Sequence, residues 1–181
     1  MTFIYSPKED SYLLEHVLLS KLPTLIKSQS DLNFLEIGVG SGLQLNAALK
    51  AGVKVENIFG VDINPDAIKQ CKKLNFNCKK SNLFEKVKRK FDIIVFNPPY
   101  LPEDKETEDE ESKIITTGGK KGSEIINKFL IQAKTHLKVK GKIFLVTSSL
   151  TKKINWLNYK KRKAAEKKIF FEKLFVWELS L

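Results

Sequence analysis

The sequence predicts one α/β domain in which helices cover both faces of an open, mostly parallel sheet. Two observations predict this fold class. Short apolar segments typical of strands alternate with amphipathic segments of helical period along the whole chain. The chain also has 181 residues with 42% apolar content, which suits one domain with a substantial core. No internal repeat or low-complexity linker divides residues 1–181.

The elements follow from apolar periodicity and from the residues that begin and end each segment. We expect Pro23 to end the first helix and Gly141 to end the fourth, and Asn64 to cap the third with Pro65 directly after it. The last strand is expected to run antiparallel to its neighbour. The expected helices are 5–23, 40–52, 64–74, 122–141 and 151–168, and the expected strands are 32–38, 55–62, 76–81, 91–96, 141–149 and 172–181.

The charge of the chain is strongly positive but unevenly placed. The formal net charge is +11, and of the 32 basic residues only Arg89 and Arg162 are arginine. Nucleic-acid recognition favours the bidentate arginine fork, so a solvated lysine surface explains the excess better than a nucleic-acid interface. Residues 103–111 hold seven acids and one lysine, a net charge of −6 that leaves +17 on the remainder. We expect an acidic, solvated loop at 103–112.

The composition argues against several classes of protein. The N-terminus is polar by residue 6, unlike a secretory signal, and no apolar run approaches the length of about 18 residues that spans a membrane. Cys71 and Cys78 lie seven residues apart without a CxxC pattern, and the chain has two histidines. We therefore expect no metal site and no disulfide framework, and two unpaired, half-buried cysteines in a cytoplasmic protein.

The ends of the first two strands carry residues suited to a cofactor, because ligands of open α/β sheets bind beyond the carboxyl ends of the strands. The first strand leads into LEIGVGSG, where Gly38, Gly40 and Gly42 allow the backbone to approach a ligand closely. Glu36 precedes these glycines; it would repel a pyrophosphate and attract an ammonium group. Asp62 ends the next strand, 20 residues beyond Gly42, and is suited to accept both ribose hydroxyls.

A nucleoside that carries an ammonium group and no pyrophosphate indicates S-adenosylmethionine. Asn82, after the third strand, can face the adenine edge because an amide both accepts and donates. A dinucleotide is the competing ligand, but its G-x-G-x-x-G fingerprint requires glycine where Leu43 stands. Each residue alone could be an ordinary turn residue, and their combination predicts the cofactor.

The segment FDIIVFNPPYLP, residues 91–102, ends a buried strand on a polar amide and two prolines. This suits methylation of an amide or exocyclic amine, whose delocalised lone pair must be held in line with the sulfonium carbon. The Asn97 side-chain oxygen and the Pro98 carbonyl would each accept one N–H of that nitrogen. Pro98 and Pro99 supply rigidity through their fixed φ angles, and Tyr100 would stack on the planar group.

Four blocks of the sequence resemble the class I S-adenosylmethionine-dependent methyltransferases that act on amino groups. They are YSPKEDSYLL (5–14), LEIGVGSG (35–42), FNPPY (96–100) and GGKKGSE (118–124). The first and last make the chain most similar to the HemK-type protein glutamine N5-methyltransferases, in the short archaeal and eukaryotic branch that modifies the GGQ glutamine of translation release factors. The resemblance covers nearly the whole chain. It implies a Rossmann-like fold with a seven-stranded, mostly parallel sheet and an antiparallel last strand.

The resemblance also assigns residues to the site. Segment 1–22 is expected to cover the cofactor, and no residue is expected to bind a metal. The family usually has aspartate in place of Asn82, so we expect weaker cofactor selectivity. The cofactor-binding residues it implies are Tyr5, Pro7, Ser11, Glu36, Gly38, Gly40, Gly42, Asp62, Ile63, Asn82, Leu83 and Asn97, and the substrate glutamine would be held by Asn97, Pro98, Pro99 and Tyr100.

The resemblance further implies two protein partners and no membrane partner. One is the release factor as substrate. The other is a small zinc-binding activator protein that forms a heterodimer, for which the weak edge strand 76–81 is a plausible docking site. The acidic run 103–111 would attract a basic GGQ region and repel phosphate, which argues against a nucleic-acid substrate.

Two other functions compete with this interpretation. An N6-adenine or other amino-group methyltransferase acting on DNA or RNA would share the Asn97–Tyr100 motif and suit the positive charge. Against it, 181 residues leave no room for a target-recognition domain, and the acidic run borders the site. A cofactor-binding scaffold without catalysis would not need the intact motif. Lysine methylation stays open as a side activity, although an amide-shaped clamp suits lysine poorly.

Overall fold

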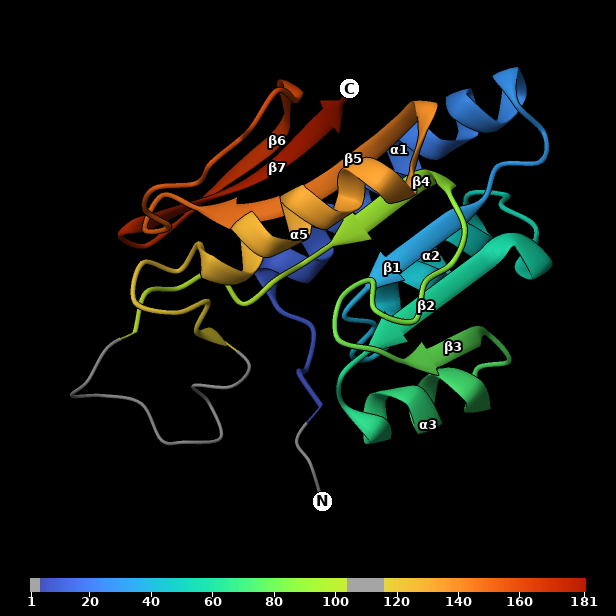
Figure 1. Ribbon diagram of the computed structural model, residues 1–181, viewed down its shortest axis with the longest axis horizontal. Helices are drawn as coiled ribbons and strands as arrows, with labels where there is room; N and C mark the ends of the chain where they lie inside the picture. The colour runs from blue at the N-terminus through green and yellow to red at the C-terminus, as the bar shows by residue number, and fades with distance from the viewer. Residues whose placement is uncertain (1–3, 104–115) are drawn as a thin grey trace.

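The computed structural model describes residues 4–103 and 116–181, which form one seven-stranded sheet with helices (Figure 1). The described helices are α1 (Glu9–Ser28), α2 (Leu43–Lys50), α3 (Pro65–Lys73) and α5 (Glu124–His136), with a short 3₁₀ turn at Val55–Asn57. The strands are β1 (Phe34–Ile37), β2 (Ile58–Asp62), β3 (Asn77–Lys80), β4 (Phe91–Phe96), β5 (Leu137–Ser148), β6 (Lys160–Ile169) and β7 (Glu172–Ser180).

The strand order is β3-β2-β1-β4-β5-β7-β6. All neighbours from β3 to β5 pair in parallel, and β7 pairs antiparallel with both β5 and β6. The predicted mostly parallel sheet with an antiparallel last strand is therefore confirmed. The order reverses between β1 and β4, which is the place where open sheets of this kind bind ligands.

Helices cover both faces of the sheet, but unequally. Helices α1, α2 and α3 pack on one face, where Leu14, Leu45 and Ile68 join a common core. On the other face α5 packs Phe129 and Leu130 against the central strands. The connections between β3 and β4 and between β5 and β6 contain no helix in the described chain, so loops alone cover the outer strands on the α5 side. Within the described residues no helix is long and apolar enough to cross a membrane.

The first helix does not end at Pro23, as the sequence predicted. Helix α1 continues to Ser28, with Pro23 on its exposed side. There the carbonyl that loses its intrahelical N–H partner can bind water instead. Leu25 and Ile26, after the proline, pack against the core and stabilise the last turn.

The prediction that Gly141 ends the fourth helix is also wrong. Helix α5 ends at His136 and β5 begins at Leu137. Gly141 lies inside β5, close to a shift in its register with β4, and a Cβ there would approach Leu137 Cδ1 to 2.7 Å. The glycine therefore permits the irregular backbone of the strand at this point, and it does not end a helix.

The basic helix predicted at 151–168 is a strand in the structure. Residues 160–169 form β6, which pairs along its length with β7, and the segment before it is irregular. The sequence KKRKAAEKKI has good helix formers but no apolar stripe with which a helix could pack. Pairing with β7 supplies backbone hydrogen bonds in place of those that a solvated helix would form. In addition, Ala164 and Ala165 pack against the core, close to a shift in the register of β6 with β7.

The cysteines also differ from the prediction. Cys71 and Cys78 are paired as a disulfide that joins α3 to β3, with their Cα atoms 6.2 Å apart, inside the range that a disulfide spans. Both residues are buried, because the turn after α3 folds β3 back along the helix. The N-terminus of α3 agrees with the prediction: the Asn64 side chain accepts the Asp66 N–H at 2.9 Å.

Candidate active site

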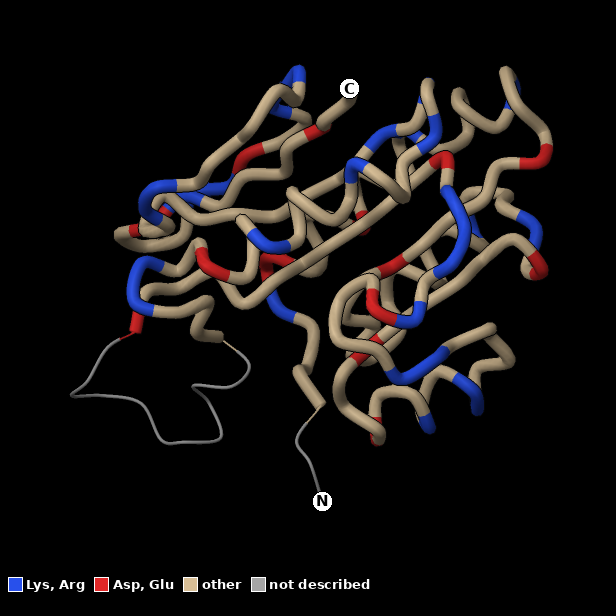
Figure 2. The backbone as a smooth tube through the Cα atoms, viewed as in Figure 1, with Lys and Arg blue, Asp and Glu red and all other residues tan. Residues whose placement is uncertain are grey.

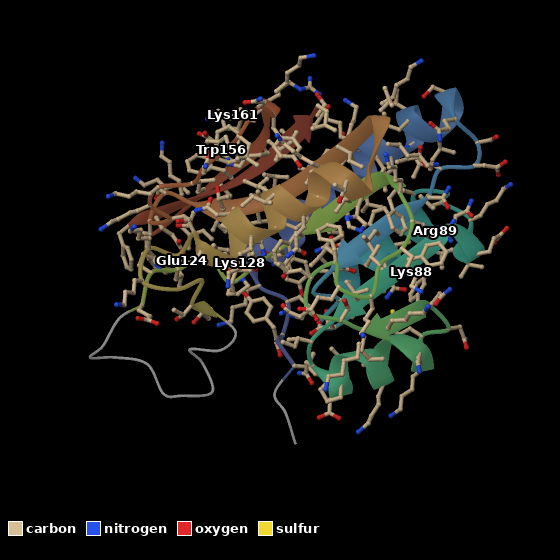
Figure 3. The ribbon with its side chains drawn as sticks, in the orientation of Figure 1. Lys88, Arg89, Glu124, Lys128, Trp156 and Lys161 are labelled. Atoms are coloured by element: carbon tan, nitrogen blue, oxygen red, sulfur yellow. A yellow bond between two sulfur atoms is a disulfide. The ribbon has the colours of Figure 1, made fainter. Side chains whose placement is uncertain are left out.

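A cavity of about 450 Å³ lies beyond the carboxyl ends of β1, β2 and β4. It stands at the reversal of strand order, as expected for an open α/β sheet. Ile4 and Tyr5 of the N-terminal segment line one side, and this segment runs beside the ends of the central strands in Figure 1. Lys128 and Gln132 of α5 line another side, and Figure 3 labels Lys128.

Most of the predicted site residues come together at this cavity. Pro7, Gly42, Pro98 and Tyr100 are not among its lining residues: Gly42 is the N-cap residue of α2, with a φ of +83°, and the Tyr100 hydroxyl donates to Asp10. The predicted residues that line the cavity are Tyr5, Ser11, Glu36, Gly38, Gly40, Asp62, Ile63, Asn82, Leu83, Asn97 and Pro99.

Three buried side-chain oxygens in the described chain have no hydrogen-bond partner: Glu36 Oε2, Gln44 Oε1 and Asn97 Oδ1. All three belong to residues that line the cavity. A buried acceptor without a donor costs about 1–3 kcal/mol, so a ligand with several N–H donors would stabilise this arrangement. The ammonium group of S-adenosylmethionine and the NH2 of a carboxamide are such donors. The residues present therefore fit both the predicted cofactor and an amide substrate.

Glu36 and Asp62 form an acidic pair under the glycine loop. Burial, and next the negative charge of Asp62, raise the pKa of Glu36 well above its ordinary range. Burial also raises the pKa of Asp62, although the N–H groups of Gly40 and Asn64 donate to its carboxylate at 2.9 and 2.8 Å and act in the opposite direction. A cation bound beside Glu36 would stabilise its charged form.

The glycine loop brings backbone to the edge of the cavity. Gly38 and Gly40 have φ angles of +69° and +46°, which other residues rarely adopt. A Cβ on Gly40 would meet no atom within 4 Å, so its open side is available to a ligand. The Gly40 N–H is held by Asp62, which ties the loop to the end of β2.

Asp10 lies at the centre of the site, and the sequence analysis did not include it. It is buried at the start of α1 and accepts hydrogen bonds from the Tyr5 hydroxyl at 3.0 Å, the Tyr100 hydroxyl at 3.3 Å and the Asn97 Nδ2 at 3.1 Å. A carboxylate only accepts, so it sets the Asn97 NH2 toward itself and leaves Oδ1 toward the cavity. Asp10 stands four residues before Leu14, on the buried face of the helix, and an acid on an apolar face was the signal that could have identified it.

The two tyrosines that contact Asp10 act as hydrogen-bond donors. Burial, and next the charge of Asp10, raise the pKa of both the Tyr5 and the Tyr100 hydroxyl above the ordinary value. Both hydroxyls are therefore protonated at neutral pH, and neither is suited to act as a base.

Segment 118–124 supports the backbone of the Asn97–Tyr100 motif. A Cβ on Gly118 would approach the Pro99 carbonyl oxygen to 2.5 Å, and one on Gly122 would collide with the Tyr100 carbonyl oxygen. Glu124, labelled in Figure 3, accepts the backbone N–H groups of 121 and 123 and closes the turn. The glycines of this block thus permit two stretches of backbone to lie in direct contact.

Asn82, after β3, also lines the cavity. Its Nδ2 donates to Glu85 at 3.0 Å, so its Oδ1 is the atom available to accept from an adenine amine. Leu83, next to it, has a φ of +48° and also lines the cavity. Gln132, which the sequence analysis did not include, accepts the Phe84 N–H at 3.3 Å and fixes this turn against α5.

Comparison with known proteins adds independent findings. A family model described as Methyltransferase small domain matches residues 15–168. A putative protein N5-glutamine methyltransferase of Methanocaldococcus jannaschii is 38% identical over 97% of this chain and 92% of its own length. Methyltransferase HEMK2 of Mus musculus is 30% identical over 80% of this chain and 71% of its own length.

Among solved structures, the E. cuniculi Mtq2–Trm112 complex aligns with a TM-score of 0.71 at 22% identity, covering 98% of both chains. That complex is described as responsible for methylation of the translation termination factor eRF1. At this level of identity the likeness shows the fold alone.

Proposed function

The chain belongs to the methyltransferase small domain family and is an S-adenosylmethionine-dependent methyltransferase, and from that premise we propose that it methylates the N5 nitrogen of the GGQ glutamine in a translation release factor. The observation that carries the proposal is the buried, unpartnered Asn97 Oδ1 beside the cofactor cavity. We place this activity in the cytoplasm, where translation ends. The name of the Methanocaldococcus jannaschii relative, a putative protein N5-glutamine methyltransferase, supports the same substrate class.

In the proposed reaction the chain positions a poor nucleophile. Asn97 Oδ1 accepts one N–H of the substrate carboxamide, and the Pro98 carbonyl accepts the other, so the nitrogen is held with its lone pair toward the methyl donor. Both acceptors also stabilise positive charge as it develops on that nitrogen. Asp10 keeps the Asn97 amide in the orientation that this requires. Stacking of the Tyr100 ring on the substrate remains a prediction.

S-adenosylmethionine supplies the methyl group on a sulfonium, an electrophile that needs no metal ion or added oxidant. Glu36 and Gln44 would provide the acceptors for its ammonium group, and Asp62 would provide those for its ribose. Asn82 and Leu83 line the cavity where they would border the adenine, and Tyr5 and Ser11 line it where they would close the methionine end. Pro7, outside the lining, would set the path of the covering segment.

We further propose that a small zinc-binding activator binds at the β3 edge of the sheet. Strand β3 is a four-residue edge strand, and only Cys78 of it is buried. On the α5 side a second hollow is lined by apolar residues of β1, β2 and β4, including Phe59 and Phe91, because no helix covers them. Arg89 lies 4.3 Å from the Phe59 ring, and Figure 3 labels it with Lys88 on this rim. A partner that adds a strand at β3 would cover the apolar hollow. Acidic groups of that partner would face the basic rim.

The test is a methyl-transfer assay with labelled S-adenosylmethionine. The acceptors are release factor, the same factor with its GGQ glutamine changed to alanine, and total RNA and DNA, each with and without the activator protein. We expect label on the intact factor alone, and none with Asn97→Ala enzyme that still binds cofactor. Label in nucleic acid instead would contradict the proposal and favour an adenine or other amino-group methyltransferase.

A further inference from the structure

The tip of the β6–β7 hairpin exposes two adjacent phenylalanines. Phe170 and Phe171 are 90% and 89% exposed, and among the described large apolar residues only Val139 matches them. Phe170 also has a φ of +46°, which is unfavourable for a bulky residue and would suit glycine or asparagine. The two side chains are too exposed to stabilise the core, and the backbone at Phe170 is strained. The packing of the fold therefore does not explain why these residues are phenylalanines.

The charges at the tip are also unfavourable within the fold. Lys168 lies directly opposite Lys173 across the two strands, and like charges in that position destabilise a hairpin. Two basic residues elsewhere in the hairpin have partners: Arg162 pairs with Glu178, and Lys161 lies 4.6 Å from the ring of Trp156. Figure 3 labels the last two residues, and Figure 2 shows the basic residues along β6. Exposure, strain and charge repulsion thus coincide at one turn.

The tip lies on the side of the sheet where the parallel strands end and the cavity opens. Glu172, the first residue after the phenylalanines, accepts from Ser148 Oγ at 2.6 Å, at the carboxyl end of β5. Lys173 exchanges hydrogen bonds with Ser149, and Thr151 in the same connection donates to the Tyr100 carbonyl at 2.9 Å. Figure 1 shows the hairpin turn beside the end of β5. One short connection therefore links the tip to the backbone of the Asn97–Tyr100 motif.

We infer that Phe170 and Phe171, flanked by Lys168 and Lys173, form a docking element for the folded domain that presents the target glutamine. This inference rests on the proposed function. Because Asn97 Oδ1 is buried, a glutamine can reach it only from a protruding loop, and the body of its domain must rest on the rim of the site. The tip is continuous with that rim, and its chemistry fits a protein surface with an apolar depression bordered by acidic groups.

The chemistry favours a protein over a nucleic acid at this tip. The hairpin has one arginine, Arg162, and it is held by Glu178 away from the tip, so no planar guanidinium is available for phosphate or base edges. Glu172 lies next to the phenylalanines and would repel a phosphate backbone. The two phenylalanines, by contrast, offer a compact apolar anchor with low conformational entropy.

The experiment compares Phe170→Ser/Phe171→Ser with Val139→Ser, a control at an equally exposed apolar residue near the opposite end of β5. KM and kcat are measured with intact release factor, and the Kd for S-adenosylhomocysteine is measured by calorimetry. We expect the double variant to raise KM about 10-fold with kcat and cofactor affinity within about twofold, while the control matches wild type.

The outcomes separate the docking inference from the proposed function. Methylation by the wild-type chain with an unchanged KM in the double variant would overturn the docking inference alone. Loss of affinity for RNA in the double variant with an unchanged KM would assign the tip to nucleic acid and also overturn it. Failure of the wild-type chain to methylate any release factor with the activator protein present would overturn the proposed function and, with it, the docking role.

Discussion

At the scale of single residues, the proposed reaction depends on which way the Asn97 amide faces. Asn97 has a donor end and an acceptor end, and only the acceptor end can hold a substrate N–H. The Asp10 carboxylate binds the donor end at 3.1 Å and thereby selects the orientation. The contact joins residues 87 positions apart, at the start of α1 and the end of β4.

Asp10→Asn tests this positioning role. An asparagine there can donate as well as accept, so the Asn97 amide can turn over and present its NH2 to the substrate. We expect kcat to fall about 100-fold with the cofactor Kd changed less than about threefold, measured by steady-state kinetics and calorimetry. Glu9→Gln, at the exposed neighbouring acid, should behave like wild type. A kcat within about twofold of wild type in Asp10→Asn would show that Asp10 does not orient the amide.

Glu36 predicts a pH-dependent affinity for the cofactor. Its raised pKa means that the folded, ligand-free chain retains a proton on Glu36 at pH values where an ordinary glutamate, with a pKa of about 4.3, has lost it. The contribution of Glu36 to stability therefore decreases as pH rises above that ordinary value. The ammonium group binds the charged form, so the affinity should weaken as pH falls toward the raised pKa.

Calorimetry between about pH 8 and about pH 5 would measure this effect, with two buffers of different ionisation enthalpy to detect proton release on binding. In Glu36→Gln the affinity should be weaker throughout and flat over the same range. A wild-type Kd that does not change with pH would contradict the assignment of Glu36 to the ammonium group.

At the scale of elements, the Asn97–Tyr100 loop, for which we propose the catalytic role, is held by the neighbouring segment 118–124. Gly122, with a φ of +75°, lies where any Cβ would collide with the Tyr100 carbonyl oxygen. The Thr151 hydroxyl donates to the same carbonyl at 2.9 Å. The position of the motif therefore depends on close backbone contact between segments that are distant in sequence.

Gly122→Ala should damage activity more than stability. We expect the free energy of unfolding to fall by about 1–3 kcal/mol and kcat/KM to fall at least about 100-fold, because the Tyr100 backbone must move. Gly52→Ala is the matched control: Gly52 has a φ of +102°, but a Cβ there meets only Ile26, at 3.7 Å. It should lose similar stability, measured by urea unfolding, and keep its activity. Equal loss of activity in both variants would mean that the effect is general instability.

At the scale of the whole molecule, the two edges of the sheet differ. The β6 edge is strongly basic: six of its ten residues are lysine or arginine, which discourages pairing with another strand. The β3 edge is short and borders an apolar hollow that loops leave open. The proposed activator therefore belongs at β3.

Arg89→Glu tests that placement. Arg89 covers the Phe59 ring on the rim of the hollow, so reversing its charge should repel an acidic partner. We expect about a 10-fold weaker Kd for the activator at low salt, a smaller difference at high salt, and unchanged cofactor affinity, all measured by calorimetry. Lys27→Glu, on α1, is the control. Equal affinity in both variants would place the activator elsewhere.

The sequence by itself determined the features that depend on neighbouring residues. Gly38 and Gly40, the acids that end or follow buried strands, the Asn64 cap and the rigid Asn97–Tyr100 segment all depend on chemistry within a few positions. Because the carboxyl ends of parallel strands meet at one edge, these local signals were sufficient to predict that most of these residues gather at that edge, and their role in cofactor binding stays a prediction. The acidic run 103–111 was equally plain in the sequence, but nearly all of it lies outside the described residues, and its role stays a prediction.

Tertiary structure alone decided the features in which distant segments compete or combine. Lysine-rich 160–169 has the composition of a helix, but hydrogen bonding to β7 made it a strand. The disulfide of Cys71 with Cys78 required α3 and β3 to lie together, and the contact of Asp10 with Asn97 required α1 to cross the end of β4. The physical reason is the same in each case: local preferences are worth tenths of a kcal/mol per residue, and the packing and pairing of whole elements exceed them.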